Sequence, residues 1–118
     1  VETMWKMLQL NKPDDFVVAT GKSKSVREFI EECFKAINIK VNWKGKGINE
    51  KGFNNNNGEL LIKIDPSYIR PSDISELRGN SKKAQKILKW KPKTSFQELS
   101  KNMVLNDIEL LKNEKNNY

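Results

Sequence analysis

The pattern with the clearest chemical potential is Tyr68-x-Arg70-Pro71-x-Asp73. An arginine presents a planar fork of N–H donors that suits a phosphate or a carboxylate. Pro71 fixes its own backbone and restricts that of Arg70, so the guanidinium is held at a low cost in conformational entropy. Asp73 can accept hydrogen bonds from sugar hydroxyls or from the N–H donors of a base edge. The residues alone equally allow a plain surface pair of Arg70 with Asp73 and a packing role for Tyr68.

Several other kinds of chemistry lack the residues that they require. The chain has no histidine and a single cysteine, which excludes a zinc site of the usual Cys/His type and removes the usual general base near neutral pH. Gly45-Lys46-Gly47 begins like a dinucleotide-binding fingerprint, but Glu50 stands where the third glycine is needed. We therefore predict no catalytic, cofactor-binding or metal-binding residue in these 118 residues.

The basic composition raises nucleic acid as a partner, because the formal net charge is +7. Nearly all of the positive charge is lysine, with Arg27, Arg70 and Arg78 as the only arginines, and the lysines are spread along the chain. This distribution is typical of a solvated surface. We therefore predict no nucleic-acid partner, and a small basic nucleic-acid-binding module remains the alternative from a different functional class.

The sequence also predicts a cytoplasmic setting without a membrane partner. No apolar run approaches the roughly 20 residues that a membrane-spanning helix needs, and the first residues do not form a signal peptide. The single cysteine, Cys33, cannot form an internal disulfide and is expected to behave as a small hydrophobic residue in a reducing compartment.

The first part of the chain shows a helical pattern that is already present at residue 1, a short apolar strand and one strongly marked helix. Apolar residues recur at helical spacing from the first residue, so we interpret the chain as part of a larger protein. The apolar run Phe16 to Ala19 predicts a short strand of the kind that is buried in a parallel sheet. Ser25 and Glu28 form a capping box, which predicts a helix start. That helix places these residues on one face: Val26, Phe29, Ile30, Cys33, Phe34 and Ile37.

Two further strands are predicted in the middle of the chain. Ile39, Val41 and Trp43 alternate as in a half-buried strand, and Leu60 to Ile64 predicts another. The polar, glycine-bearing segment from Lys44 to Gly58 predicts a mobile loop between them.

The last part of the chain predicts two helices. A short helix around Lys82 to Leu88 is expected to direct Ala84, Ile87 and Leu88 inward. A last helix is marked by Phe96, Leu99, Met103, Leu110 and Leu111, and we expect residues 112–118 to form a frayed tail.

Several motifs together resemble the family of GDP-mannose 4,6-dehydratases. Ala19-Thr20-Gly21, followed by Ser25-Val26-Arg27-Glu28-Phe29, is similar to a stretch of that family with the same residue types in the same order. The same order continues along nearly the whole chain, to about residue 112, through these motifs: Trp43-Lys44-Gly45-Lys46-Gly47, Asp65-Pro66-x-Tyr68-x-Arg70-Pro71, Lys83-Ala84 and Leu88-x-Trp90-Lys91-Pro92.

This resemblance implies an α/β fold, with the chain as the C-terminal, substrate-binding portion of an extended short-chain dehydrogenase/reductase. Residues 1–118 would form the GDP-sugar-binding portion, including elements that complete the sheet of a missing N-terminal Rossmann domain. The missing domain would bind NADP and hold the catalytic Tyr-x-x-x-Lys, because neither Tyr68 nor Tyr118 has a lysine four residues further on. The whole enzyme would convert GDP-mannose to GDP-4-keto-6-deoxy-mannose with loss of water, as a homo-oligomer.

Carried over by position, the resemblance implies that Arg70 binds the diphosphate and that Asp73, where the family usually has glutamate, contacts the nucleoside. Tyr68 belongs to the same motif and is the third candidate substrate-binding residue. Arg27 lies on the polar side of its helix, which favours a structural or interface role over ligand binding. The alternative within the superfamily is another nucleotide-sugar epimerase or dehydratase.

Overall fold

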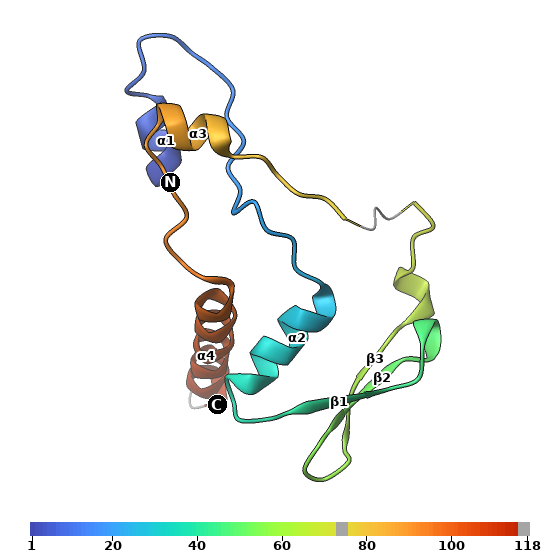
Figure 1. The fold of residues 1–118 in the computed structure, drawn as a ribbon. Helices are drawn as coiled ribbons and strands as arrows, with labels where there is room; N and C mark the ends of the chain where they lie inside the picture. The colour runs from blue at the N-terminus through green and yellow to red at the C-terminus, as the bar shows by residue number, and fades with distance from the viewer. Residues whose placement is uncertain (73–75, 116–118) are drawn as a thin grey trace. The chain divides into compact units, whose positions relative to one another are not determined.

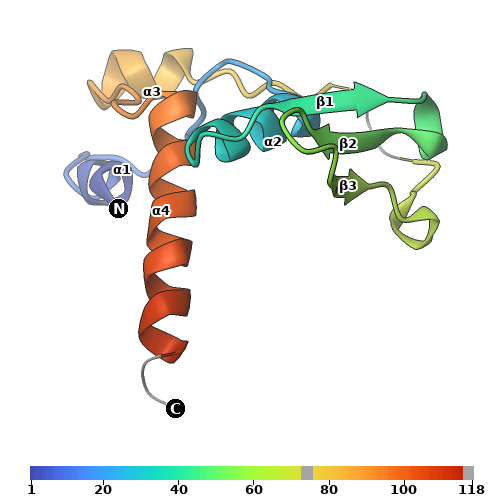
Figure 2. The same ribbon diagram turned by 90° about the horizontal axis from the view of Figure 1, so that it is seen from below.

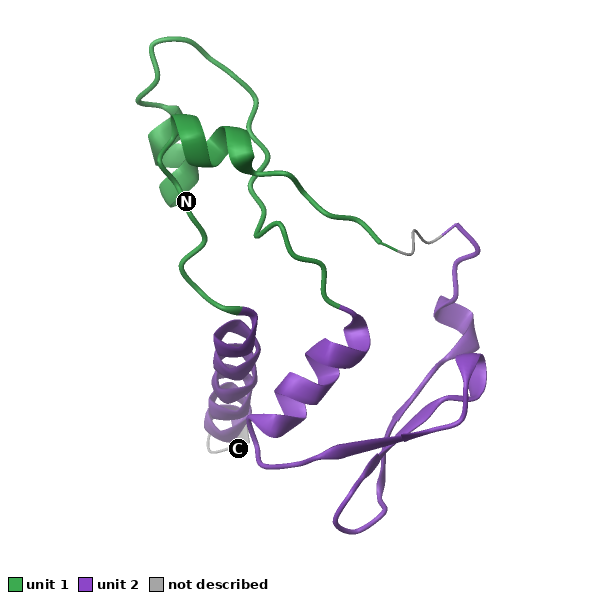
Figure 3. Cartoon of the chain, in the orientation of Figure 1, with its two compact units in different colours: residues 1–24, 74–95 green, residues 25–73, 96–118 purple. Residues whose placement is uncertain are grey.

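The structure is a computed structural model that describes residues 1–72 and 76–115 (Figure 1). It combines helices with a three-stranded antiparallel sheet, which agrees with the predicted α/β class. The chain divides into two compact units, residues 1–24 with 74–95 and residues 25–73 with 96–118 (Figure 3). Each unit has its own packing.

The first unit contains two short helices, α1 (Glu2–Met7) and α3 (Lys82–Ile87). Both confirm predictions from helical spacing. Its buried residues are few and mostly small: Thr3, Ser81, Ala84 and Leu88. The apolar residues Met4, Trp5 and Leu8 around α1 are exposed. The first unit therefore has a small core and a substantial exposed apolar surface.

Two predictions for the first unit are wrong. Residues 16–19 form no strand, because no described segment pairs with them. Instead the run lies against the backbone of Gly79, where an added Cβ would come within 2.6 Å of the Ala19 Cβ. Ile87 does not point inward, since 44% of it is exposed, whereas Ala84 and Leu88 are buried as predicted.

Two ion pairs join distant parts of the first unit, and a third lies within α1. The Lys83 ammonium lies 2.6 Å from Asp14 Oδ1, and Glu2 lies 3.1 Å from Lys6 and 2.9 Å from Lys93. Hydrogen bonds from these lysines hold the pKa of Glu2 and that of Asp14 below their ordinary values.

We expect the first unit to lose stability in acid because both carboxylates have a folded-state pKa below the unfolded one. Their contribution is fully present above the unfolded values, 4.5 for Glu2 and 3.8 for Asp14, and is lost as the pH falls through the folded values. Urea unfolding at a series of pH values should show a smaller acid dependence for Asp14→Asn than for the unchanged chain. An unchanged dependence would show that this ion pair contributes nothing to folding.

The second unit is built on two helices that pack together, α2 (Val26–Lys35) and α4 (Phe96–Lys115). The predicted capping box of α2 is confirmed: the Ser25 side chain accepts from Glu28 N–H, and the Glu28 carboxylate accepts from Ser25 N–H. The Phe29 ring of α2 meets the Phe96 ring of α4 at a centroid distance of 6.1 Å. Ser100 of α4 is fully buried and donates to the Phe96 carbonyl at 2.8 Å. The small Ser100 side chain thus occupies a buried position on this helix.

The apolar face of α2 is partly confirmed. Its central members Phe29, Ile30, Cys33 and Phe34 are half-buried. Val26 at the helix start and Ile37 beyond the helix end are exposed. Burial raises the pKa of the Cys33 thiol, with a smaller contribution from the Glu32 carboxylate. Cys33 is therefore a protonated, weakly reactive thiol at neutral pH, in agreement with its predicted role as a small hydrophobic residue.

The sheet of the second unit has the strand order β1 (Val41–Lys44), β2 (Lys51–Asn54), β3 (Leu60–Lys63) (Figure 2). β1 and β3 confirm predicted strands, and the register pairs Trp43 with Gly52 and Gly52 with Ile62. The prediction of a mobile loop from Lys44 to Gly58 is wrong, because this segment holds the central strand β2 and the 3₁₀ turn η1 (Gly47–Asn49). Glycine, lysine and asparagine have low strand propensity, so the sequence of β2 does not indicate a strand. Hydrogen-bonded pairing with β1 and β3 on its two sides stabilises β2 instead.

Helix α4 confirms the predicted last helix and continues to Lys115. Residues 112–115 of the expected tail are therefore helical, and residues 116–118 lie outside the described part of the chain. Among the described residues, no helix is both long enough and apolar enough to cross a membrane.

Candidate functional site

The candidate binding motif follows strand β3 and begins with a tight turn. Asp65 Oδ1 accepts hydrogen bonds from the Ser67 backbone N–H (2.9 Å) and the Ser67 hydroxyl (2.7 Å). These bonds lower the pKa of Asp65, so its carboxylate stays ionised as the cap of the 3₁₀ turn η2 (Pro66–Tyr68). The turn closes with hydrogen bonds from Tyr68 N–H to Asp65 O and from Ile69 N–H to Pro66 O, both 3.2 Å. This geometry fixes the chain direction immediately before Arg70.

Two of the three predicted site residues have a described position, and both are exposed. Tyr68 is 80% exposed at the end of η2, which disagrees with a packing role inside this chain. Arg70 is exposed two residues later, after Ile69 in extended conformation. No described residue forms an ion pair or hydrogen bond with the Arg70 side chain. Asp73 lies outside the described residues. Arg70 therefore presents its guanidinium to solvent from a defined stretch of backbone.

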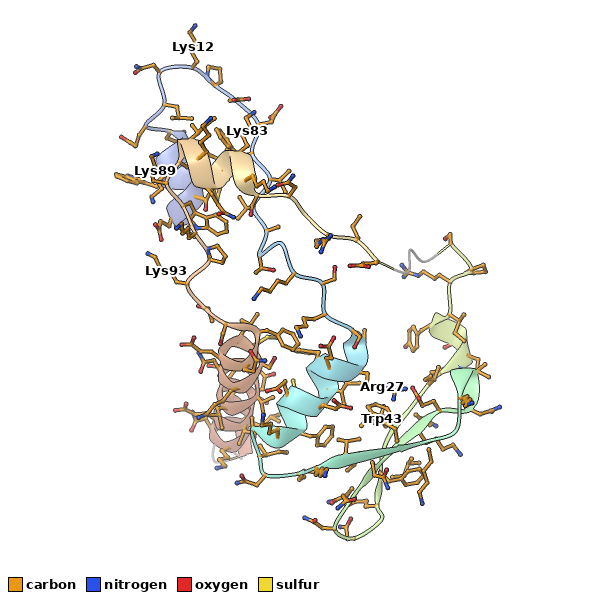
Figure 4. The ribbon with its side chains drawn as sticks, viewed as in Figure 1. Lys12, Arg27, Trp43, Lys83, Lys89 and Lys93 are labelled. Carbon is orange, nitrogen blue, oxygen red and sulfur yellow. The ribbon has the colours of Figure 1, made fainter. Side chains whose placement is uncertain are left out.

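A cluster of four side chains joins α2 to the sheet that carries this motif. We call it the Arg27 clamp; it consists of Arg27, Glu31, Trp43 and Glu50. The Arg27 guanidinium forms an ion pair with Glu50 and lies 4.9 Å from the centre of the Trp43 ring (Figure 4). The Trp43 indole N–H donates to Glu31 Oε1 at 2.8 Å. These contacts agree with the structural or interface role that the sequence favoured for Arg27.

The clamp reaches the binding motif through the sheet. Trp43 in β1 lies over Gly52 in β2, and an added Cβ on Gly52 would come within 3.2 Å of the Trp43 ring and 2.9 Å of Ile62 in β3. β3 then leads directly into η2 and Arg70. Packing contacts within the sheet therefore connect α2 to the start of the binding motif.

Sequence reasoning missed Glu31 and Glu50 as members of this cluster. Glu31 lies 12 residues from Trp43, and Glu50 lies 23 residues from Arg27. Solvated faces and polar loops contain many such carboxylates, so no local signal marks these two.

Among the described residues, each unit has a surface hollow. The hollow in the second unit has a volume of about 570 Å³ and lies between α2 and β1, lined by residues that include Glu31, Lys35 and Val41. The hollow in the first unit has a volume of about 520 Å³ and is lined by residues that include Arg78 and Lys82. Neither hollow is lined by Tyr68 or Arg70. Within residues 1–72 and 76–115, no group of three or more histidine, cysteine, aspartate or glutamate side chains could hold a metal ion.

Comparison with known proteins decides the family. The sequence model described as GDP-mannose 4,6 dehydratase matches residues 1–103. The chain belongs to this family. The match includes all of the described motif around Tyr68 and Arg70, together with the Arg27 clamp.

Individual members of the GDP-mannose 4,6 dehydratase family are similar over nearly the whole chain. The GDP-mannose 4,6 dehydratase of Dictyostelium discoideum is 51% identical over 113 residues, which cover 96% of this chain and 32% of the relative. That of Drosophila melanogaster is 46% identical, covering 95% of this chain and 28% of the relative. The Homo sapiens protein of the same name is 43% identical, covering 98% and 31%. The chain therefore spans less than a third of the length of these relatives.

Proposed function

We propose that this chain is the GDP-sugar-binding portion of a GDP-mannose 4,6-dehydratase. The whole enzyme converts GDP-mannose to GDP-4-keto-6-deoxy-mannose with loss of water. Membership of the family supports the reaction and the substrate. The observation that supports the binding role is the exposed Arg70, whose backbone is fixed by the η2 turn on one side and by Pro71 on the other.

In this proposal Arg70 binds the diphosphate of GDP-mannose. Its fork can donate two parallel hydrogen bonds to phosphate oxygens, and solvent exposure leaves these donors accessible. Asp73 accepts hydrogen bonds from the nucleoside. Tyr68, with its exposed ring and hydroxyl, contacts the same ligand.

The described residues of this chain do not fit the cofactor NADP. A dinucleotide site needs a glycine-rich turn that opens an α-helix, where backbone N–H groups meet the pyrophosphate. Here Gly45 and Gly47 lead into the 3₁₀ turn η1 and then into strand β2. We therefore assign NADP binding to a Rossmann domain outside these 118 residues and derive no step of hydride transfer from this chain.

The catalytic residues belong to the same outside portion in this proposal. The parent enzyme would be a cytoplasmic short-chain dehydrogenase/reductase that assembles as a homo-oligomer. In this proposal, the residues of this chain bind the nucleotide part of the substrate.

The isolated chain is expected to show no dehydratase activity with GDP-mannose and NADP. The physical reason is that neither tyrosine is followed by a lysine at the catalytic spacing and that no histidine is present to act as a base. Chromatographic detection of the 4-keto sugar checks this, with a full-length relative as the positive control. Turnover by a pure, sequence-verified sample of the 118 residues would contradict the assignment. Salt-sensitive binding to generic duplex DNA would instead favour the nucleic-acid alternative.

A further inference from the structure

The loop between β2 and β3 carries the one Asn-Gly pair of the sequence, Asn57-Gly58. Both residues are exposed. Gly58 has a φ of +74°, and a Cβ added to it would meet nothing within 4 Å. The side of Gly58 on which a Cβ would stand is therefore open space.

This pair has the groups needed for deamidation through a cyclic imide. The Gly58 backbone nitrogen, after losing its proton to hydroxide, attacks Asn57 Cγ and forms a new C–N bond. The bond from Cγ to Nδ2 breaks, and Nδ2 leaves as ammonia after taking a proton from water. Water then opens the ring at either carbonyl, which gives aspartate or isoaspartate. The net reaction consumes one water molecule and releases ammonia. Because glycine has no Cβ, ring closure meets little steric hindrance.

The folded hairpin engages every group that this reaction uses. Gly58 N–H donates to the Asn54 carbonyl at 2.8 Å, so the attacking nitrogen keeps its proton. Glu59 N–H donates to Asn57 Oδ1 at 3.0 Å, and Asn57 Nδ2 donates to Glu59 Oε2 at 3.4 Å. These bonds hold the side chain in one orientation. Attack on Cγ then requires the loop to open.

We propose that Asn57 is a conformationally gated deamidation site, protected in the closed β2–β3 hairpin and reactive when the hairpin opens. The product also hinders closure. A carboxylate at position 57 loses the Nδ2 donor and stands beside the Glu59 carboxylate, and isoaspartate adds a methylene to the loop backbone. Each opening that ends in reaction therefore converts Asn57 irreversibly to aspartate or isoaspartate.

The test compares the rate at Asn57 in the folded and the unfolded 118-residue chain. Samples are held at mildly alkaline pH in native buffer and in urea, digested with trypsin and analysed by tandem mass spectrometry of the peptide 52–63. We expect Asn57 to react about tenfold more slowly in native buffer, which corresponds to about 1.4 kcal/mol of opening free energy. Asn54, Asn55 and Asn56 lie in the same peptide and serve as internal controls, because no glycine follows them. If the deamidation rates at Asn57 in the two buffers agree within about twofold, the closed hairpin does not protect Asn57. If all four asparagines react at equal rates in urea, Asn57 is not a preferred deamidation site.

A hairpin variant separates gating from local sequence. Gly52→Val leaves Asn57-Gly58 unchanged but places atoms within about 3 Å of the Ile62 and Val41 side chains, which must shift, so we expect the hairpin to open more often. We expect its rate in native buffer to approach the rate in urea. Asn42→Thr, at an exposed position of β1, is the matched control and should keep the slow rate. A Gly52→Val chain whose Gly58 amide exchanges hydrogen freely while Asn57 stays protected would refute the proposal.

Discussion

Replacing Arg70 by alanine in the full-length enzyme should weaken binding of GDP-mannose by about ten- to a hundredfold. A charge-assisted, forked contact with the diphosphate contributes roughly 1.5–3 kcal/mol, which converts to that range of affinity. The Arg70 side chain is exposed, and no described residue holds it, so truncation should cost binding without costing stability. Isothermal titration with GDP-mannose measures the change, after circular dichroism has shown that the variant is folded.

Two further variants test the geometry and the charge of this contact separately. Arg70→Lys keeps the positive charge but loses the planar fork, and should restore part of the lost affinity. Lys86→Ala removes an exposed lysine from α3 and should leave binding unchanged within about twofold, as expected for one of many solvated charges. A folded Arg70→Ala enzyme that binds within twofold of the unchanged one would show that the diphosphate contact is absent.

Replacing Leu88 by alanine should destabilise the first unit by about 2–5 kcal/mol, the usual cost of removing a large buried apolar side chain. Leu88 is 5% exposed and follows α3, where its only buried apolar companion among the described residues is Ala84. A core of this size has few other contacts with which to offset the cavity. The loss is a large share of the 5–15 kcal/mol that stabilises a typical domain.

Urea unfolding and limited proteolysis of residues 1–24 and 74–95 measure this effect. The matched control is Leu77→Ala in the same unit, because Leu77 is 82% exposed and its removal leaves no cavity. We expect the control to shift stability by less than about 0.5 kcal/mol. Similar losses for the two variants would mean that Leu88 is not a core residue of this unit.

Local features of the binding region could be predicted from the sequence because their contacts span a few residues. The capping box joins Ser25 to Glu28, three residues away, and its hydrogen bonds form in the structure as the spacing indicates. Pro71 likewise restricts the backbone of Arg70, which follows the 3₁₀ turn η2 and Ile69 in extended conformation. The helical spacing of apolar residues along α4 and the alternation of β1 were equally readable. The structure nevertheless leaves Leu99, Met103, Leu110 and Leu111 of the α4 pattern exposed.

The sequence by itself therefore determined the helices α1 to α4, the outer strands β1 and β3, and the motif that carries Arg70. The tertiary structure decided that a glycine- and asparagine-rich segment forms the central strand β2, that Phe16 to Ala19 forms no strand, and that Arg27 is held by Glu50 and Trp43. The physical reason is the range of the interactions. Caps, turns and periodic faces are fixed by neighbours along the chain, whereas strand pairing and ion pairs depend on partners that chain composition does not reveal.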